Sequence, residues 1–200
     1  MGQRLIITVN KGGKDIAKIY YHWSAYSISA LQEARDVINV LYDDTNKIKD
    51  LKLRLIRFCE QNGGGIDGGE NSSEWKYIKQ LYPKETFKKD SISRNYGLIA
   101  LSEDGMKNMQ TWSEGDIYID MDTDMVTNYV NFTCESIDNY NKDRKEWDED
   151  FTPKTLNEIP AIENDLTEFS VFDIEDVIYE LKSFDGYVCR YRNQIYELIA

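Results

Sequence analysis

An alternation of apolar and polar residues near the N-terminus constrains the fold of this chain more than any other feature. Leu5, Ile7 and Val9 share one face of a short β-rich segment, and the alternation returns over 15–24. Residues 11–14, Lys-Gly-Gly-Lys, have turn chemistry because glycine adopts positive φ angles without steric cost. The sequence therefore predicts an N-terminal β-hairpin.

Helical and strand-like patterns alternate through the rest of the chain. Apolar residues at helical spacing, bounded by capping or turn residues, predict helices over about 27–42, 46–61, 71–82, 102–112 and 173–183. Strands are expected at 96–101, at 116–121 with 125–133, and at 187–191 with 194–199. We therefore expect an α+β fold whose antiparallel sheet is built from three hairpins, N-terminal, central and C-terminal, with helices packed mainly on one face.

The chain length of 200 residues fits one domain with a sizeable core. We expect residues 1–134 to form an α+β core that carries a basic helix and a glycine-rich loop. Residues 135–168 are expected to form an acidic connecting segment. Residues 169–200 are expected to add a helix and a hairpin that return to the same domain.

Several classes of protein are disfavoured by composition. No apolar run approaches the ~20 residues of a membrane-spanning helix, and the apolar run 5–9 is too short for a signal region. The three cysteines, Cys59, Cys134 and Cys189, are odd in number and far apart, which fits neither a disulfide framework nor a zinc site. We expect a cytoplasmic protein that does not contact a membrane.

Charge is distributed unevenly along the chain. The net charge is −12, and residues 1–100 hold 16 Lys and Arg against 12 Asp and Glu, whereas residues 101–200 hold 8 against 24. An acidic surface repels phosphate backbones, so direct nucleic-acid binding is not expected. The acidic residues serve solubility, or they face a basic partner.

The glycine-rich segment 62–69, Asn-Gly-Gly-Gly-Ile-Asp-Gly-Gly, is the most unusual stretch of the sequence. Such loops can bind phosphate through bare backbone N–H groups. The candidate ligand-binding residues are Arg54, Arg57, Gly63, Gly64, Gly65 and Asp67. Against this interpretation, the preceding pattern is helical where phosphate loops follow a strand, and no Gly-Lys-Ser/Thr is present. The alternatives are a plain connection between helices and a loop that becomes ordered on a partner.

His22 is the only histidine, and it lies in the aromatic segment 20–26. Imidazole titrates near neutrality, so His22 could act as a general base, or it could be a structural residue at a strand end. Tyr21, His22, Trp23 and Tyr26 are candidate partner-binding residues, since aromatic side chains are enriched at interfaces. No catalytic constellation accompanies them, so an enzyme is the less favoured class.

The acidic residues do not form a metal-binding pattern, and we expect no cofactor. Asp116, Asp120, Asp122 and Asp124 share one strand parity, but Met125 stands where a calcium loop needs glycine. The segment 143–150 instead surrounds an aromatic ring with negative charge, which suits a partner with a basic groove. Its candidate partner-binding residues are Asp143, Glu146, Trp147, Asp148, Glu149 and Asp150.

Three segments, 2–9, 19–26 and 62–69, resemble small uncharacterised proteins of bacteriophages and prophages from low-GC Gram-positive bacteria. The resemblance covers about the first 120 residues and carries no catalytic motif. It implies an accessory role in the host cell, commonly the inhibition of a host defence system.

Three hypotheses follow. The first is a non-enzymatic protein that binds and inhibits a host protein, plausibly a defence component, through its acidic and aromatic surface. The second is a protein that sequesters a nucleotide-like signalling ligand through the glycine-rich loop and the basic helix. The third is a small enzyme that uses His22.

Overall fold

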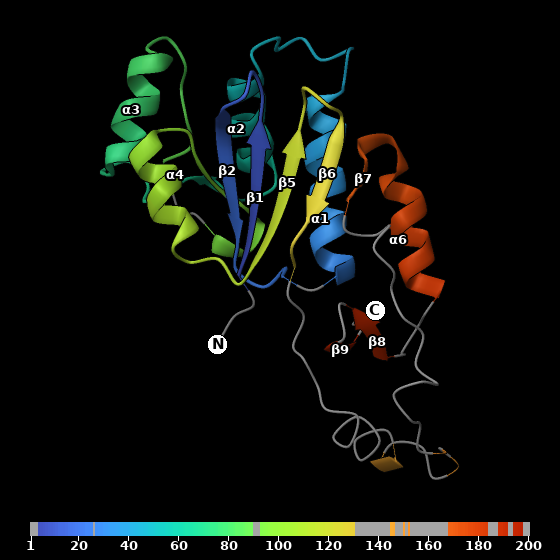
Figure 1. Ribbon diagram of the computed structural model, residues 1–200. Helices are drawn as coiled ribbons and strands as arrows, with labels where there is room; N and C mark the ends of the chain where they lie inside the picture. Colours follow the sequence, from blue (N-terminus) through green and yellow to red (C-terminus); the bar gives the residue numbers. More distant parts are fainter. Residues whose placement is uncertain are drawn as a thin grey trace.

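The computed structural model describes residues 4–25, 27–89, 93–130, 145–146, 150, 152, 168–183, 188–191 and 194–197. Within them, a seven-stranded sheet has helices on both faces (Figure 1). Its strands are β1 (Leu5–Asn10), β2 (Asp15–Tyr21), β3 (Gly65–Ile66), β4 (Leu98–Ala100), β5 (Gly115–Asp120), β6 (Met125–Asn128) and β7 (Glu168–Ser170). The α-helices are α1 (Ser27–Leu41), α2 (Leu51–Gln61), α3 (Ser73–Leu81), α4 (Glu103–Gln110) and α6 (Ile174–Ser183). Two short 3-10 helices are η1 (Arg94–Tyr96) and η4 (Val171–Asp173).

The fold is α+β, but the sheet is mixed. Its strand order is β3-β4-β2-β1-β5-β6-β7, and β1 pairs in parallel with β5, as β3 does with β4. The expectation of one antiparallel sheet built from three hairpins is not confirmed. The pairs β1–β2 and β5–β6 are antiparallel neighbours in this sheet, whereas β8 (Val188–Tyr191) and β9 (Gln194–Glu197) pair only with each other. Parallel pairing needs a long crossover, and the helices α1 to α4 lie between β1 and β5 in sequence.

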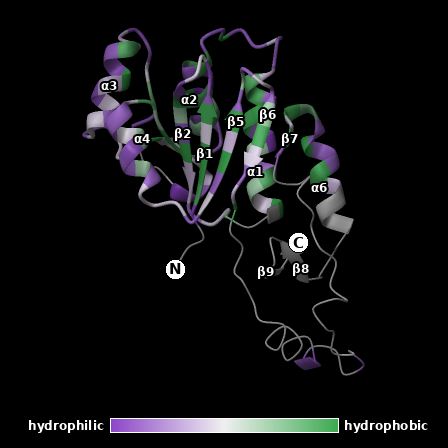
Figure 2. Cartoon of the chain, in the orientation of Figure 1, coloured by the Kyte–Doolittle hydropathy of each residue, from purple (hydrophilic) through white to green (hydrophobic). Residues whose placement is uncertain are grey.

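Among the described residues, α1, α2, α3 and α6 contribute to the core on one face of the sheet, and α4 covers part of the other face, which agrees with the expectation of helices packed mainly on one face. Strand residues of one parity, such as Ile7 and Ile19, belong to a large core shared with α1, α2 and α6. The opposite parity, with Ile6 and Tyr20, forms a smaller core beneath Met109 of α4. Alternating burial of successive strand residues produces this division. Figure 2 shows hydrophobic residues along the central strands.

A strand lies inside the glycine-rich segment, where the sequence predicted only a loop between two helices. Gly65 donates its N–H to the carbonyl of Gly97, with N and O 3.1 Å apart, and β3 then runs parallel to β4. The neighbouring Gly64 permits this approach because a Cβ there would lie 1.8 Å from the Gly97 oxygen. The second half of the segment, 67–69, therefore follows a strand and precedes helix α3, and the residue pattern had indicated the helix but not the strand.

The C-terminal part returns to the sheet. Strand β7 pairs with β6, and α6 packs on α1. Of the expected acidic connecting segment 135–168, only residues 145, 146, 150, 152 and 168 lie within the described part of the chain. No helix among the described residues is both long and apolar enough to cross a membrane.

Candidate functional site

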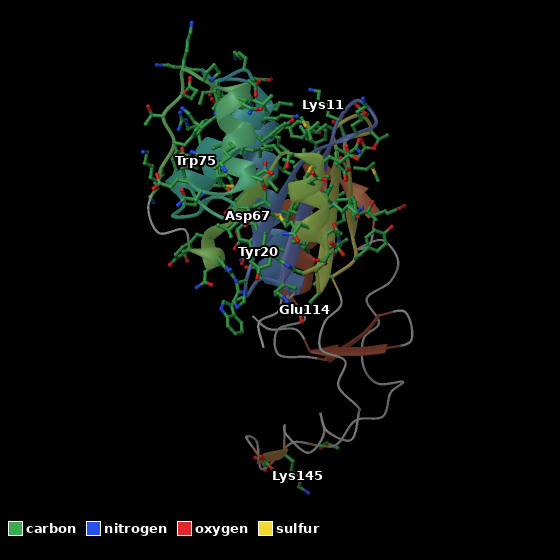
Figure 3. All side chains as sticks on the ribbon, turned by 90° about the vertical axis from the view of Figure 1, so that its left-hand side faces the viewer. Lys11, Tyr20, Asp67, Trp75, Glu114 and Lys145 are labelled. Carbon is green, nitrogen blue, oxygen red and sulfur yellow. The ribbon has the colours of Figure 1, made fainter. Side chains whose placement is uncertain are left out.

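A cleft of about 710 Å³ lies beside the smaller core, between the segment that precedes α3 and helix α4. Its walls come from three parts of the sequence: residues 67–74, residues 89 and 94–98, and residues 104–112. The residues that line it are Asp67, Gly68, Gly69, Ser72, Ser73, Glu74, Lys89, Arg94, Leu98, Asp104, Gly105, Asn108 and Trp112. Figure 3 views this side of the molecule, with Asp67 and Tyr20 near its centre.

Asp67 stands where β3 ends, at the inner side of the cleft. Its backbone N–H donates to the carbonyl of Ile99, with N and O 3.0 Å apart, so the residue continues the parallel pairing with β4. Burial raises the pKa of the Asp67 carboxyl, while the N–H of Gly68 and the charge of Arg94 act in the opposite direction. Burial deprives this carboxyl of part of its hydration, so hydrogen-bond donors on a ligand would stabilise its charged form.

Glu74 fixes the two helical walls of the cleft to each other. Its side chain, in the first turn of α3, accepts the N–H groups of Leu101 and Ser102 at 2.6 and 3.0 Å, and also the hydroxyl of Ser102. The residue is 3% exposed. A Cβ at Gly105 would lie 2.1 Å from a Glu74 carboxylate oxygen, so a larger residue there would displace the Glu74 side chain. This carboxylate is satisfied within the protein and is therefore a structural group of the site.

Arg94 is the cation of the cleft that remains available. Its guanidinium lies over the Trp112 ring, 6.0 Å from the ring centroid. No carboxylate or carbonyl among the described residues accepts a hydrogen bond from it. The other cation, Lys89, lies 3.5 Å from a carboxylate oxygen of Glu70 in an exposed ion pair. A guanidinium whose contact is with an aromatic ring keeps its N–H groups free for a phosphate or carboxylate.

His22 lies next to the cleft without lining it. Its Nδ1 is 2.6 Å from the hydroxyl of Tyr20, and its backbone N–H donates to the Arg94 carbonyl at 2.9 Å. Tyr20 is buried, its pKa is raised by that burial, and its ring meets Trp112 edge-on at 5.6 Å. The hypothesis of an enzyme that uses His22 would pair the imidazole with a nearby carboxylate. The structure instead pairs it with the phenol of Tyr20.

The structure places Arg54 and Arg57 outside the cleft. Arg54 is buried, and its guanidinium donates to the carbonyls of Val40, Leu41, Asp43 and Ile48 at 2.9–3.2 Å. Arg57 donates to Glu60 and Glu85 at 2.7 and 2.6 Å. Both cations hold neighbouring segments of the chain, so neither is free for a ligand.

The glycines of the segment 62–69 also differ in whether they line the cleft. Gly63, Gly64 and Gly65 lie against Tyr96 and Gly97, away from the cleft, whereas Gly68 and Gly69 line it. Of the ligand-binding residues proposed from the sequence, Asp67 alone lines the cleft. Arg94, Asn108 and Trp112 were missed because nothing in the sequence indicates that they meet Asp67.

The proposed partner-binding residues are also separated. Tyr21 is buried in the large core, so it cannot contribute a surface ring, whereas Trp23 is 49% exposed. Glu146 and Asp150 are exposed. Tyr26, Asp143, Trp147, Asp148 and Glu149 lie outside the described residues.

Metal binding finds no support in the described part of the chain, where no three His, Cys, Asp or Glu side chains form a group able to hold an ion. The carboxylates of the central hairpin have other partners. Asp122 accepts the Gly13 N–H at 3.0 Å, and Asp124 accepts the Tyr42 hydroxyl at 2.6 Å.

Comparisons of the chain with protein-family models, curated proteins and solved structures found no match.

Proposed function

We propose that the chain binds a nucleotide-like small molecule in the cleft between α3 and α4 and sequesters it. The observation that carries this proposal is the Arg94 guanidinium, which has no hydrogen-bond partner among the described residues and lies 6.0 Å from the Trp112 ring centroid in a cleft that Asp67 also lines. A volume of about 710 Å³ is in the range of small-molecule sites. Sequestration suits a cleft whose described lining offers an aromatic ring and charges of both signs.

Different residues of the cleft suit different parts of such a ligand. Arg94 offers N–H donors to an anionic phosphate, and the planar guanidinium over Trp112 can stack with a base. Asp67 and Asp104 offer acceptors to sugar hydroxyls or to an exocyclic amine. A molecule with an anionic end and a donor-rich end matches this arrangement better than inorganic phosphate does.

Thermal denaturation with a panel of mono-, di-, tri- and cyclic nucleotides tests the proposal, with inorganic phosphate and adenosine as partial ligands. A nucleotide present at 100 times its Kd should stabilise the protein by about 2.7 kcal/mol. Arg94→Met should weaken that nucleotide about tenfold or more, since hydrogen bonds to charged groups contribute about 1.5–3 kcal/mol. Lys107→Met, an exposed change on α4 that does not line the cleft, is the matched control. A panel without any stabilising member, or equal affinity in both variants, contradicts the proposal.

Inhibition of a host protein, plausibly a defence component, is the second candidate function. Trp23 and Tyr96 expose 49% and 56% of their surface, on two segments joined by the hydrogen bond from His22 to Arg94. Exposed aromatic rings beside an aqueous cleft are typical of contact surfaces. An acidic C-terminal half makes the interaction with a basic partner sensitive to salt.

Recovery of one stoichiometric host protein by the immobilised chain would test this second function. Binding should fall with added salt and with Trp23→Ala or Tyr96→Ala. Tyr179→Ala is the control, because Tyr179 is also an exposed aromatic residue, at 77%, but lies on α6. Loss of binding in the control alone would contradict the assignment.

A further inference from the structure

The face of the sheet that carries α4 is only half covered. Helix α4 packs on β2 and β4, where Met109 closes the smaller core. Farther along the same face, the strands β1, β5 and β6 present polar and tyrosine side chains of one parity. These are Asn10, Asp116, Tyr118, Asp120 and Thr127, and Tyr129 follows β6, whereas Thr8 of the same parity is buried.

A second cleft of about 450 Å³ lies on this open half, lined by Asn10, Tyr118, Asp120, Thr127 and Tyr129. The two tyrosine rings stand nearly perpendicular, at 83°, with centroids 6.0 Å apart. Tyr129 is 45% exposed. Two perpendicular rings present π faces in two directions, which is the geometry of sites that hold ammonium groups.

The Tyr118 ring already lies near one cation of the chain. The Lys18 ammonium lies over the Tyr118 ring, 5.6 Å from its centroid, and it is fixed there by hydrogen bonds to Thr8 and Gln110 at 2.9 and 2.6 Å. Lys18 is 6% exposed. Its position shows that the Tyr118 ring accommodates an ammonium group at cation–π distance.

The carboxylates around these rings outnumber that ammonium. Asp15 lies 3.7 Å from Lys18, and Asp116 accepts a hydrogen bond from Gln110 at 2.7 Å. Asp120 lines the cleft itself. Burial raises the pKa of Tyr118, with the charges of Asp116 and Asp15 acting in the same direction. Three carboxylates against one ammonium leave the open half of the face attractive to a second cation.

We propose that this second cleft binds an organic cation, an alkylammonium group that sits against Tyr118 and Tyr129 beside Asp120. The site is separate from the cleft between α3 and α4, with which it shares no lining residue. The same chemistry is carried by a free quaternary ammonium compound and by a methylated lysine side chain.

Titration of the isotopically labelled full chain, followed by NMR of the tyrosine rings, tests the site. The probe is tetramethylammonium, and 2,2-dimethylpropan-1-ol is the neutral control of similar shape. Selective changes at Tyr118 and Tyr129, with affinity about tenfold higher for the cation, support the proposal. Equal responses to cation and alcohol, or changes spread evenly over the tyrosines, overturn it.

Variants examine the rings and the charge separately. Tyr129→Phe should keep the affinity within about twofold, whereas Tyr129→Leu should lower it about tenfold. Asp120→Asn should weaken the cation without affecting the alcohol. Equal losses in the Phe and Leu variants overturn the proposal, since a bound cation needs the ring and not the hydroxyl. Backbone amide spectra confirm that each variant is folded.

A comparison of choline with Nα-acetyl-Nε-trimethyl-lysine amide identifies the source of the cation. Tighter binding of choline assigns the site to a free compound, and tighter binding of the lysine derivative assigns it to a protein side chain. Either result supports an ammonium site. Failure of both to compete with tetramethylammonium overturns it.

Discussion

The two halves of the glycine-rich segment use one residue type for different purposes. In the first half, Gly64 and Gly65 allow the backbone to approach Gly97 and form β3. In the second half, Gly68 and Gly69 follow Asp67 along the wall of the α3–α4 cleft. The run of glycines is therefore not one functional unit. The first half forms part of the sheet scaffold, and the second half lines the cleft.

The strongest test of the scaffold half is Gly64→Ala. Its Cβ would lie 1.8 Å from a backbone oxygen that cannot rotate away, so we expect a loss of about 3 kcal/mol or more in the free energy of unfolding. Urea denaturation measures it. Gly13→Ala is the control, since a Cβ there meets nothing within 4 Å and only the positive φ is unfavourable. Similar losses in both variants would contradict a steric role for Gly64.

Glu74→Ala tests whether the cleft walls depend on one carboxylate. The N–H groups of Leu101 and Ser102 would lose their acceptor, and we expect a loss of roughly 2–4 kcal/mol on urea denaturation. Glu70→Ala, four residues earlier in the chain, removes only an exposed ion pair with Lys89 and should lower the free energy of unfolding by less than about 1 kcal/mol. A smaller loss for Glu74 than for Glu70 would show that α3 and α4 are held by other contacts.

The two arginines extend the comparison to side chains. Arg54→Met keeps the apolar stem but removes the guanidinium donor from four carbonyls. Of these, only the Asp43 carbonyl has another donor among the described residues, the Asn46 N–H, so the free energy of unfolding should fall by about 2 kcal/mol. Arg94→Met removes no hydrogen bond between described residues and should change stability by less than about 0.5 kcal/mol while lowering ligand affinity. Differential scanning calorimetry with and without nucleotide separates the two effects. The reverse order of stability would refute this division of roles.

The smallest expected effect concerns the pH dependence contributed by Asp67. Burial raises the pKa of its carboxyl above the usual 3.8, so the folded protein retains a proton that the unfolded chain releases. Stability relative to Asp67→Asn should therefore fall as the pH rises from about 3.8 through the raised pKa. Unfolding free energies of both proteins across pH 4–7 provide the measurement. A difference that does not vary with pH would show that the carboxyl is solvated in the folded state.

Local pattern was enough to predict part of the fold. Alternation and turn residues identified the pairs β1–β2 and β5–β6, because each depends on residues adjacent in sequence. The parallel pairs could not be predicted, since β1 and β5 meet only after more than a hundred residues of intervening chain. Strand β3 has two residues, one of them glycine, so no propensity marks it.

The candidate site was harder to predict than the fold. Asp67 was identified through its glycine neighbours, but Arg94 and Trp112 lie on η1 and after α4, and only the tertiary fold brings them to the cleft. Arg54 was chosen for its charge, although its position in a helix after a break favours contacts with the carbonyls that end α1. A basic pattern indicates where cations occur in the sequence and does not show which of them are already paired.

The sheet ends, within the described residues, at two of its shortest strands. β3 has two residues and β7 has three, so each edge exposes few unpaired backbone groups. Long exposed edges recruit strands from other molecules, and very short ones give an incoming strand little to pair with. The glycines that build β3 therefore also protect the protein against edge-to-edge aggregation. Lengthening β3 by replacing its flanking glycines would endanger that protection as well as the cleft.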